Sequence, residues 1–370
     1  MASLSDPFVS ASLPCFEAGF TALDAFHGIR PAPLGFVLVL GGLVELAKAT
    51  DGLCFPGLSY ADASLDQDPR ESGEGGSLYI RLADSQASRA RHAFKPLDLL
   101  RIPDKRASFL GPEGIYAALR SPLLLPAPAP DEDLLFQAAI LVSRYDYVLP
   151  PEFRPGIPRD FPIQAQKDIL TLILTGSHPE RGLGLLKAWG FLEAYWPELL
   201  ALEGVDQAKE FHPEGDVWAH TMETFRYRKL PDLRLSLGLL LHDSGKPGSS
   251  SVPGRKFDRH AEIGSSLAQR FLLRLGFSRS ISADVSYLVR YHMLPAALPR
   301  LPLEKGIEGV DDPLFPLLLE LYKCDELSSF KGPEGYYEAC AAYRAHQKTA
   351  RNPWRNPEAL RLARIYLGGR

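Results

Sequence analysis

The sequence has few of the features that mark a secreted, disulfide-bonded or membrane protein. Its four cysteines include no CxxC spacing, which argues against a disulfide framework and against a zinc site built from thiolates. The N-terminus has neither the basic start nor the apolar core of a signal peptide. The longest apolar run, GFVLVLGGLVELA, is too short and too interrupted by glycine to cross a bilayer. We therefore expect a cytoplasmic protein that makes no membrane contact.

The chain also lacks a strong excess of charge of one sign. The formal net charge is −4 over 370 residues, so any contact with nucleic acid must come from a local basic patch. Hydrophobic content of 45% and charged content of 23% are ordinary for a soluble globular protein. The length allows two or three compact units, at roughly 100–200 residues for each domain.

Two short apolar runs in the first third of the chain predict strands. Leu34–Leu40 is rich in β-branched and aromatic residues and ends at Gly41–Gly42, and Gly76–Leu82 has the same character. A proline-rich spacer follows at Leu123–Pro130, and helical periodicity begins behind it at Asp131–Tyr147. These patterns predict a small α/β head that is followed by a helical remainder.

Histidine is concentrated in one stretch of the helical remainder. Five of the nine histidines lie between His212 and His292. Imidazole and carboxylate ligands without thiolates suit a borderline or hard divalent metal ion. This stretch is therefore the predicted functional centre of the chain.

Helix signals place polar side chains at the ends of apolar helices in this stretch. Asp216 and Asp232 are expected N-cap residues. The segment LRLSLGLLLHD is apolar on nearly every side, which predicts a buried central helix. That helix would end at His242–Asp243, because Gly245 follows. His292 and Asp325 similarly stand at the end of apolar stripes. Three helices are thus expected to carry potential metal ligands at their ends.

The order His220, His242–Asp243 and Asp325 resembles the signature of the HD-type metal phosphohydrolases. The surrounding segments HPEGDVWAHT, LLHDSGKP, KFDRHAEIGSSLAQRFLLRL and LVRYHM are similar to the HD domain of bacterial CCA-adding tRNA nucleotidyltransferases and poly(A) polymerases. Upstream, HPERGLGLLKAWGFLEAYWPEL resembles the neck and body helices of that family. The resemblance covers roughly the last two thirds of the chain.

The resemblance implies a set of metal ligands and a cofactor. The cofactor would be a divalent ion, with Mn, Mg, Ni, Co, Fe and Zn all open. Two nitrogens and two oxygens would leave coordination positions for water and for a phosphate oxygen. Asp243 would also accept the proton of that water. The implied metal ligands are His220, His242, Asp243 and Asp325.

Four further residues are assigned roles around this metal. In family terms His260 and His292 line the cleft as phosphate or second-metal partners, although structural roles are the alternative. We expect them to act catalytically together with Asp243 and Lys246. Lys246 and Arg290 are expected to bind the substrate phosphate, although lysine and arginine are also common on protein surfaces.

The head resembles a nucleotidyltransferase only in part. In that family a strand ends in a Gly-Gly turn, as VLVLGGLVELA does here, so that backbone amides approach the nucleotide phosphates. The paired-carboxylate strand is missing, because Asp62, Asp66 and Asp68 form no D-x-D within an apolar run. The basic RRDFTxNA-type segment is missing as well. These departures predict a degenerate head that does not polymerise nucleotides.

The end of the chain is basic. Residues 344–370 carry seven Lys or Arg residues against the single acid Glu358, with Trp354 and Tyr366 interleaved. This composition suits contact with RNA, by charge and by stacking. A solvated helix that packs on the body through its leucines explains it equally well.

These observations predict a mainly α protein with a smaller α/β nucleotidyltransferase-like head. The expected domains are a head at 1–122, a helical neck at 131–205, an HD domain at 206–345 and a basic tail at 346–370. The expected activity is metal-dependent hydrolysis of a phosphoester in a nucleotide or an RNA end. The alternatives are a tRNA nucleotidyltransferase, or a non-catalytic RNA-binding relic of that family.

Overall fold

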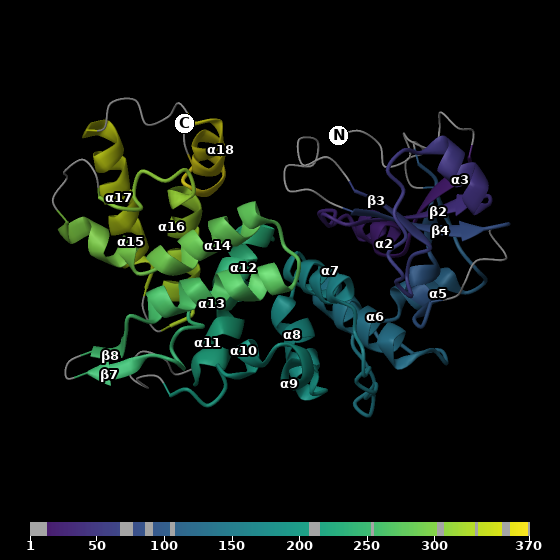
Figure 1. The fold of residues 1–370 in the computed structure, drawn as a ribbon, viewed down its shortest axis with the longest axis horizontal. Helices are drawn as coiled ribbons and strands as arrows, with labels where there is room; N and C mark the ends of the chain where they lie inside the picture. The colour runs from purple at the N-terminus through teal and green to yellow at the C-terminus, as the bar shows by residue number, and fades with distance from the viewer. Residues whose placement is uncertain are drawn as a thin grey trace. The chain divides into compact units, whose positions relative to one another are not determined.

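The structure is a computed structural model that divides into two compact units, Met1–Trp189 and Gly190–Arg370. It describes residues 13–66, 77–85, 92–103, 108–206, 215–252, 255–301, 307–329, 332–349 and 356–368. Figure 1 shows both units along the chain. His212, and the parts of the basic tail at 350–355 and 369–370, lie outside the described residues.

The first unit is built on a six-stranded sheet with the strand order β3-β4-β2-β1-β5-β6. The predicted strand at Leu34–Leu40 is confirmed as β2 (Gly35–Leu40), and the second prediction is confirmed as β4 (Ser77–Ala83). These two strands pair in parallel, with Gly35 opposite Leu78. The other strands are β1 (Cys15–Ala18), β3 (Ala63–Asp66), β5 (Leu100–Arg101) and β6 (Phe109–Leu110).

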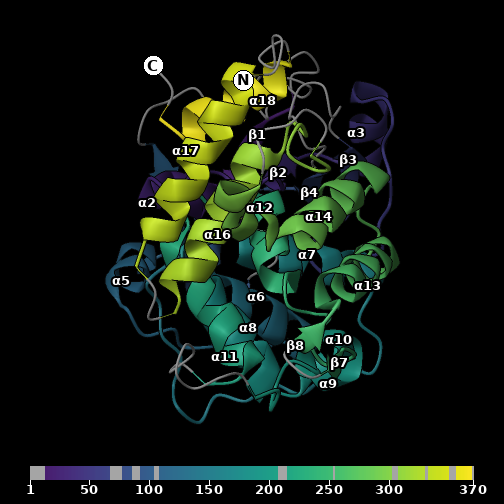
Figure 2. The ribbon, with the colours of Figure 1, turned by 90° about the vertical axis from the view of Figure 1, so that its left-hand side faces the viewer.

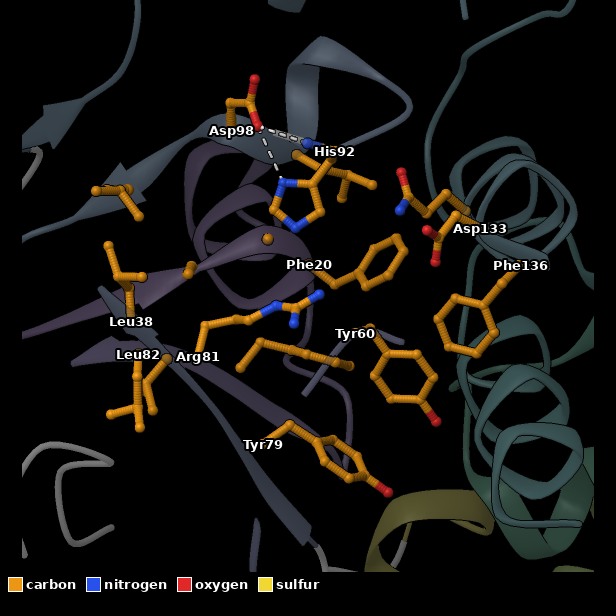
Figure 3. A pocket seen from close by; sticks show the side chains of 17 residues that line it. Phe20, Leu38, Tyr60, Tyr79, Arg81, Leu82, His92, Asp98, Asp133 and Phe136 are labelled. Atoms are coloured by element: carbon orange, nitrogen blue, oxygen red, sulfur yellow. Dashed lines mark hydrogen bonds and ion pairs between the residues drawn. The ribbon is translucent and has the colours of Figure 1, made fainter. Parts of the chain in front are cut away.

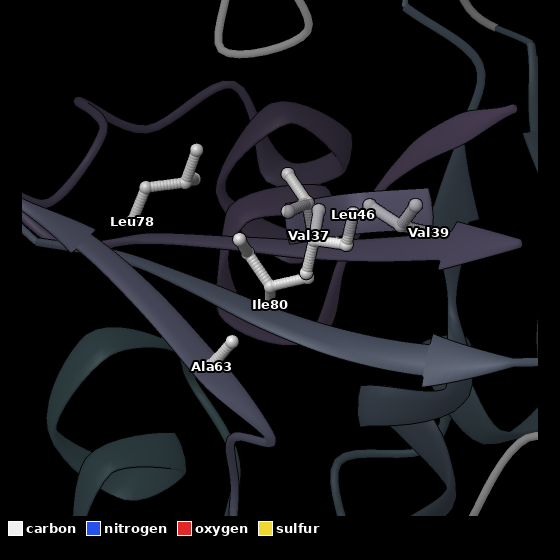
Figure 4. Packing of buried hydrophobic residues seen from close by; sticks show 6 residues of the cluster. All are labelled: Val37, Val39, Leu46, Ala63, Leu78 and Ile80. Atoms are coloured by element: carbon white, nitrogen blue, oxygen red, sulfur yellow. The ribbon is translucent and has the colours of Figure 1, made fainter. Parts of the chain in front are cut away.

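The alternation of side chains in these strands gives the sheet two apolar faces. One face packs against Leu46 of α3 (Leu43–Ala49), and its buried side chains are shown in Figure 4. The other face carries Leu38, Ala83 and Leu100. Because both faces are covered, the strands read as continuous apolar runs in the sequence. The cluster on the α3 face consists of Val37, Val39, Leu46, Ala63, Leu78 and Ile80.

Helices complete the first unit, and a buried ion pair joins two of them. Arg144 of α6 (Asp131–Arg144) is fully buried, and its Nη2 lies 2.5 Å from Oδ2 of Asp24 in α2 (Gly19–His27). The Tyr145 hydroxyl donates to Oδ1 of Asp24 at 2.8 Å. The remaining helices are η1 (Lys95–Asp98), α5 (Ile115–Arg120), α7 (Ile163–Leu174) and α8 (Pro179–Ala188).

The second unit is almost entirely helical. The central helix α12 (Leu233–Leu241) is buried along its whole length, as its composition predicts. Both predicted N-caps are confirmed: Asp216 accepts from the Ala219 amide at the start of α11 (Val217–Thr224), and Asp232 accepts from two amides of α12. The fold is therefore mainly α with a smaller α/β part, as predicted.

Further helices surround α12 in this unit. None of the helices in the described part of the chain has the length and apolar character needed to cross a membrane. A two-stranded ribbon, β7 (Ser250–Val252) with β8 (Arg255–Asp258), precedes α13. The other elements are α9 (Phe191–Tyr195), α10 (Pro197–Leu200), η2 (Phe225–Tyr227), α13 (His260–Arg274), α14 (Arg279–Tyr291), α15 (Leu294–Ala297), η3 (Leu298–Arg300), α16 (Phe315–Leu327), α17 (Glu334–Thr349) and α18 (Pro357–Tyr366).

The last helices of the chain pack onto the body of this unit. Figures 1 and 2 both show α16, α17 and α18 side by side. Leu362 and Tyr366 of α18 are buried. The Arg234 guanidinium of α12 donates to Glu358 at 2.8 Å. The described part of the basic tail is thus a packing element of the unit, and its contact with RNA stays a prediction.

Two substitutions in α18 are expected to separate packing from RNA contact. Leu362→Ala should lower the free energy of unfolding by about 2–5 kcal/mol, the usual cost of truncating a buried leucine. Arg364→Gln, on the exposed side of α18, should change it by less than about 0.5 kcal/mol. Thermal unfolding measures both. If the tail holds RNA, Arg364→Gln also flattens the salt dependence of RNA binding; an unchanged salt dependence would argue against that contact.

Candidate metal centre

Six side chains from five helices or helix ends meet in the second unit. His220 lies within α11, and His242 and Asp243 directly follow α12. His260 is the first residue of α13, His292 directly follows α14, and Asp325 lies in the last turn of α16. We call this set the HD cluster: His220, His242, Asp243, His260, His292 and Asp325.

The ligand atoms of the HD cluster form two groups of three. In the first group, His220 Nε2 lies 2.9 Å and His242 Nε2 3.8 Å from Oδ1 of Asp325. In the second, His260 Nε2 lies 3.1 Å from His292 Nε2, and both face Oδ1 of Asp243. Within each group the ligand atoms lie within 4.8 Å of one another.

Asp243 lies between the two groups. Its Oδ2 is 3.3 Å from His242 Nε2 in the first group. Its Oδ1 is 3.7 Å from His260 Nε2 and 3.9 Å from His292 Nε2 in the second. The Asp243 carboxylate, a member of the second group, therefore also faces an imidazole of the first group.

Backbone carbonyls orient three of the four imidazoles. The Nδ1 atoms of His242, His260 and His292 lie 2.8, 2.9 and 2.8 Å from the carbonyl oxygens three residues earlier in the chain. A carbonyl only accepts, so each Nδ1 carries the proton and each Nε2 presents a lone pair to the cluster. Among the described residues, the buried Nε2 of His242 has no hydrogen-bond partner, which is the environment expected of a metal-binding nitrogen.

The charge states of the cluster also suit a cation. Burial lowers the pKa of His292 to about 4, so that imidazole is neutral at pH 7. Burial raises the pKa of Asp243, but the Lys246 ammonium outweighs this effect and brings it well below its usual range. Burial likewise raises the pKa of Asp325, and the hydrogen bond with His220 outweighs it and lowers the pKa. Neutral imidazoles and ionised carboxylates are the donors that bind divalent ions, so the expected cofactor fits here.

The two predicted phosphate-binding cations differ in their surroundings. The Lys246 ammonium lies 2.6 Å from Oδ2 of Asp243 and 5.4 Å from the centre of the Phe257 ring. The Arg290 guanidinium is 43% exposed and lies 3.6 Å from Glu262. Lys246 therefore belongs to the immediate surroundings of the cluster, whereas Arg290 stands at the surface of α14.

Several residues that hold the HD cluster together were not predicted from the sequence. Ser328 Oγ lies 3.2 Å from Nδ1 of His220. A Cβ at Gly245 would lie 2.0 Å from the His260 carbonyl oxygen, so Gly245 permits the close approach of two backbones and does more than end a helix. Phe257 and Arg259 have positive φ values of 61° and 57°. Gly245, two residues after Asp243, was the signal in the sequence for a close backbone contact. Nothing in the sequence indicates the backbone conformation of Phe257.

The head contains a separate small cavity, of about 70 Å³, on the sheet face opposite α3. Figure 3 shows His92 and Arg81 pointing into the same space as Phe20 and Tyr60. Asp98 accepts from the His92 amide, and its Oδ1 lies 3.0 Å from the imidazole Nδ1. Sequence reasoning gave no role to these residues.

The carboxylates of the head are distributed along the sheet. Asp62 Oδ2 accepts from the Leu82 amide at 2.9 Å, which places it at the carboxyl end of β4. Asp66 pairs with Ser77 at the opposite end of that strand. The backbones of Asp62 and Asp66 are therefore at opposite ends of β4, and the sequence between them has no D-x-D motif. Asp68 lies outside the described residues.

Comparison with known proteins identifies relatives for much of the chain. The family model of the HD domain matches residues 215–365. A CC-adding tRNA nucleotidyltransferase of Thermus thermophilus is 29% identical over 252 residues, which cover 61% of this chain and 56% of the relative. A multifunctional CCA protein of Nitrosococcus oceani is 27% identical over 168 residues, which cover 45% and 38%. The matched region thus spans about half the length of these curated relatives or less.

Among solved structures, the Bacillus stearothermophilus CCA-adding enzyme in complex with CTP aligns with a TM-score of 0.46 at 14% identity. The alignment covers 99% of this chain and 81% of that one.

These comparisons correct one expectation from the sequence. An HD-type phosphohydrolase without polymerase activity was expected, but the curated relatives are tRNA nucleotidyltransferases and related CCA proteins. They point to nucleotidyl transfer, and the hydrolase expectation is wrong. The expectation that the head does not polymerise nucleotides rested on the absent D-x-D motif. That motif detects only two carboxylates that lie two residues apart in the sequence. The chain therefore carries an HD domain at residues 215–365 and is similar, over 61% of its length, to a CC-adding tRNA nucleotidyltransferase.

Proposed function

We propose that this protein is an RNA nucleotidyltransferase that adds nucleotides to the 3′ end of tRNA. The observation that carries the proposal is the relationship to a tRNA nucleotidyltransferase over 61% of the chain, together with an HD domain. The whole-protein activity of such relatives requires both a nucleotide site and an RNA site. We assign the nucleotide chemistry to the head.

The edge of the head sheet supports this assignment. The Gly41 amide donates to the Ala83 carbonyl at 3.1 Å, so β2 and β4 end at one edge. Asp62 is held at that edge by the Leu82 amide, and Asp84 follows β4 there. Both carboxylates are exposed. We propose that Asp62 and Asp84, beside the Gly41–Gly42 turn, supply the acidic pair that the sequence pattern does not show.

The residues at this edge suit phosphoryl transfer. A divalent ion bound by the two carboxylates would neutralise charge on a nucleoside triphosphate. The Arg81 guanidinium lies 3.3 Å from Oδ1 of Asp62 and orients that carboxylate. Gly41 has a φ of 149°, and a Cβ at Gly42 would lie 2.6 Å from a Glu45 carboxylate oxygen. The positive φ favours glycine at Gly41. The Gly42 amide donates to Glu45 Oε2 at 2.6 Å, so a nucleotide phosphate would reach that amide by replacing the Glu45 carboxylate.

The HD cluster is the second part of the proposal. We infer that His220, His242, Asp243 and Asp325 bind a divalent ion, and that His260 and His292 join Asp243 around a second position. Support comes from the converging Nε2 lone pairs and the unpartnered His242 Nε2. In this arrangement Lys246 holds the shared carboxylate in place. A phosphate-binding role for Lys246 or Arg290 stays a prediction.

An extension assay tests the nucleotidyltransferase directly. The wild-type protein is expected to extend a tRNA that lacks its 3′-terminal nucleotides when CTP and ATP are supplied. Asp62→Asn and Asp84→Asn should each reduce the rate on the order of 100-fold, as when one group that stabilises transition-state charge is removed. Asp66→Asn is the matched control, because Asp66 lies at the opposite end of β4. Equal rates in all three variants would reject the assigned pair. Retention of tRNA without any extension would instead identify an RNA-binding protein.

A further inference from the structure

A second, larger cavity lies in the first unit, away from the head sheet edge. Its volume is about 320 Å³, and it is formed where α2, α5 and α6 end and where the chain enters α8. This volume is at the lower end of the range for small-molecule sites, which starts at about 300 Å³. We call it the polar cavity, after six of its lining residues: His27, Arg120, Tyr145, Tyr147, Ser177 and His178.

The polar cavity contains an uncompensated positive charge. Among the described residues, the Arg120 guanidinium has no ion-pair or hydrogen-bond partner. Arg144 also lines the cavity, but Asp24 neutralises it. The acid that lines the cavity is Asp146, and its carboxylate lies 3.3 Å from His178 Nε2 and 3.6 Å from Arg181. Glu180 lies 3.6 Å from the other ring nitrogen of His178. Arg120 thus faces the cavity without a carboxylate of its own.

One backbone hydrogen bond caps each of the three helix ends at the cavity. A basic side chain in the last turn of a helix commonly interacts with the exposed carbonyl groups of that turn. Here backbone amides already bond these ends: Gly28 donates to Asp24 in α2, Ser121 donates to Ala117 in α5, and Tyr145 donates to Leu141 in α6. Among the described residues the Arg120 guanidinium makes no bond to the carbonyls that stay open at the end of α5, so it is available to a ligand.

The remaining walls provide hydrogen-bond groups and aromatic faces. The His27 ring lies 5.0 Å from the Tyr145 ring and 5.9 Å from the Tyr147 ring, measured between ring centres. His27 Nε2 lies 3.4 Å from the Tyr147 hydroxyl. The Ser177 side chain is exposed to the cavity mouth. The Arg120 guanidinium, the His27 imidazole and the hydroxyls of Tyr147 and Ser177 surround one space and form a donor set for an oxyanion, and arginine matches the geometry of phosphate in particular.

We propose that the polar cavity binds the phosphate monoester of a small molecule no larger than about a mononucleotide. Arg120 holds the phosphate oxygens, Ser177 donates at the mouth, and the rings of His27 and Tyr147 face the organic part. The site is separate from the HD cluster and from the acidic pair of the head, and it does not depend on the reaction that either performs.

Titration calorimetry with three probes tests the site on the full-length protein. Adenosine 5′-monophosphate and inorganic phosphate are expected to bind, and adenosine, which has no phosphate, is expected not to bind. A short 5′-phosphorylated RNA distinguishes the source of the phosphate: binding of the RNA without binding of the mononucleotide would overturn the small-molecule assignment. EDTA in the buffer prevents metal-dependent binding at the other two sites.

Two substitutions place the binding in the polar cavity. Arg120→Gln should weaken binding of the mononucleotide at least tenfold, and Ser177→Glu, which puts a carboxylate at the mouth, should abolish it. Arg270→Gln is the matched control, because Arg270 is an exposed arginine of α13 without a side-chain partner among the described residues. Both cavity residues are exposed, so we expect the variants to fold, and circular dichroism verifies this. Unchanged affinity in a folded Arg120→Gln protein would overturn the proposal, as would equal weakening by Arg270→Gln.

Discussion

Replacing His242 and Asp243 together by alanine is expected to remove bound divalent metal from the protein. The double change deletes the unpartnered Nε2 and the carboxylate that faces both groups of imidazoles. The four ligands that remain lie in two separate parts of the cluster, so neither position keeps three. Elemental analysis of purified protein by mass spectrometry should find metal in the wild type and less than about a tenth of it in the variant, a loss equivalent to at least 1.4 kcal/mol of binding free energy.

A thermal measurement gives an independent readout of the same site. A ligand that binds only the folded state stabilises it by about 2.7 kcal/mol when its concentration is 100 times its dissociation constant. Chelation should therefore lower the melting temperature of the wild type and leave that of the variant unchanged. His178→Ala with Asp146→Ala is the matched control, since it removes a His–Asp pair from the other unit. Metal retained in stoichiometric amount by the His242–Asp243 variant would reject the assigned ligands.

The second large effect concerns stability. Asp24→Ala should lower the free energy of unfolding of the first unit by about 3–5 kcal/mol, because it leaves the fully buried Arg144 guanidinium without its counter-charge. Changing both partners, with Asp24→Leu and Arg144→Met, should cost less, since no buried charge remains. Hydrogen exchange followed by mass spectrometry can resolve the loss to peptides of α2 and α6.

An exposed ion pair provides the comparison for that experiment. Arg226 and Glu223 lie 3.0 Å apart, with the arginine 66% exposed. Glu223→Ala should cost no more than about 1 kcal/mol, the usual upper value for a surface pair. If Asp24→Ala were as mild as Glu223→Ala, burial would not be what makes the Asp24–Arg144 pair important. If the double change were as costly as Asp24→Ala alone, the loss would reflect packing and not charge.

The HD cluster could be predicted because its ligands are tied to local signals. His242 and Asp243 end a helix whose apolar composition marks it as buried, and Asp216 and Asp232 mark where helices begin. Periodicity specifies the face and the end of a helix on which a residue stands. It does not specify which other helix end that residue meets, so the contact between His260 and His292 could be expected only from the resemblance.

The head shows what sequence patterns leave undetermined. Asp62 and Asp84 reach one edge because β3 and β4 pair with Ala63 opposite Ile80. That register depends on pairing in space, and no local motif records it. The Asp24–Arg144 pair is separated by 120 residues, and its members looked like ordinary helix residues. Strand existence was predictable from composition, whereas strand partners and buried polar pairs were not.

The order of contacts in the first unit has a consequence for its synthesis. β1 pairs with β5 between Glu17 and Arg101, and α2 is tied to the last residue of α6 through Asp24. A chain growing from its N-terminus therefore exposes the open edge of β1 until the ribosome has passed residue 101, and leaves Asp24 without its counter-charge until residue 144 has emerged. Pairings of such long range form slowly, and unpaired strand edges invite association with other chains. We therefore expect the nascent head to depend on chaperones until these pairings have formed.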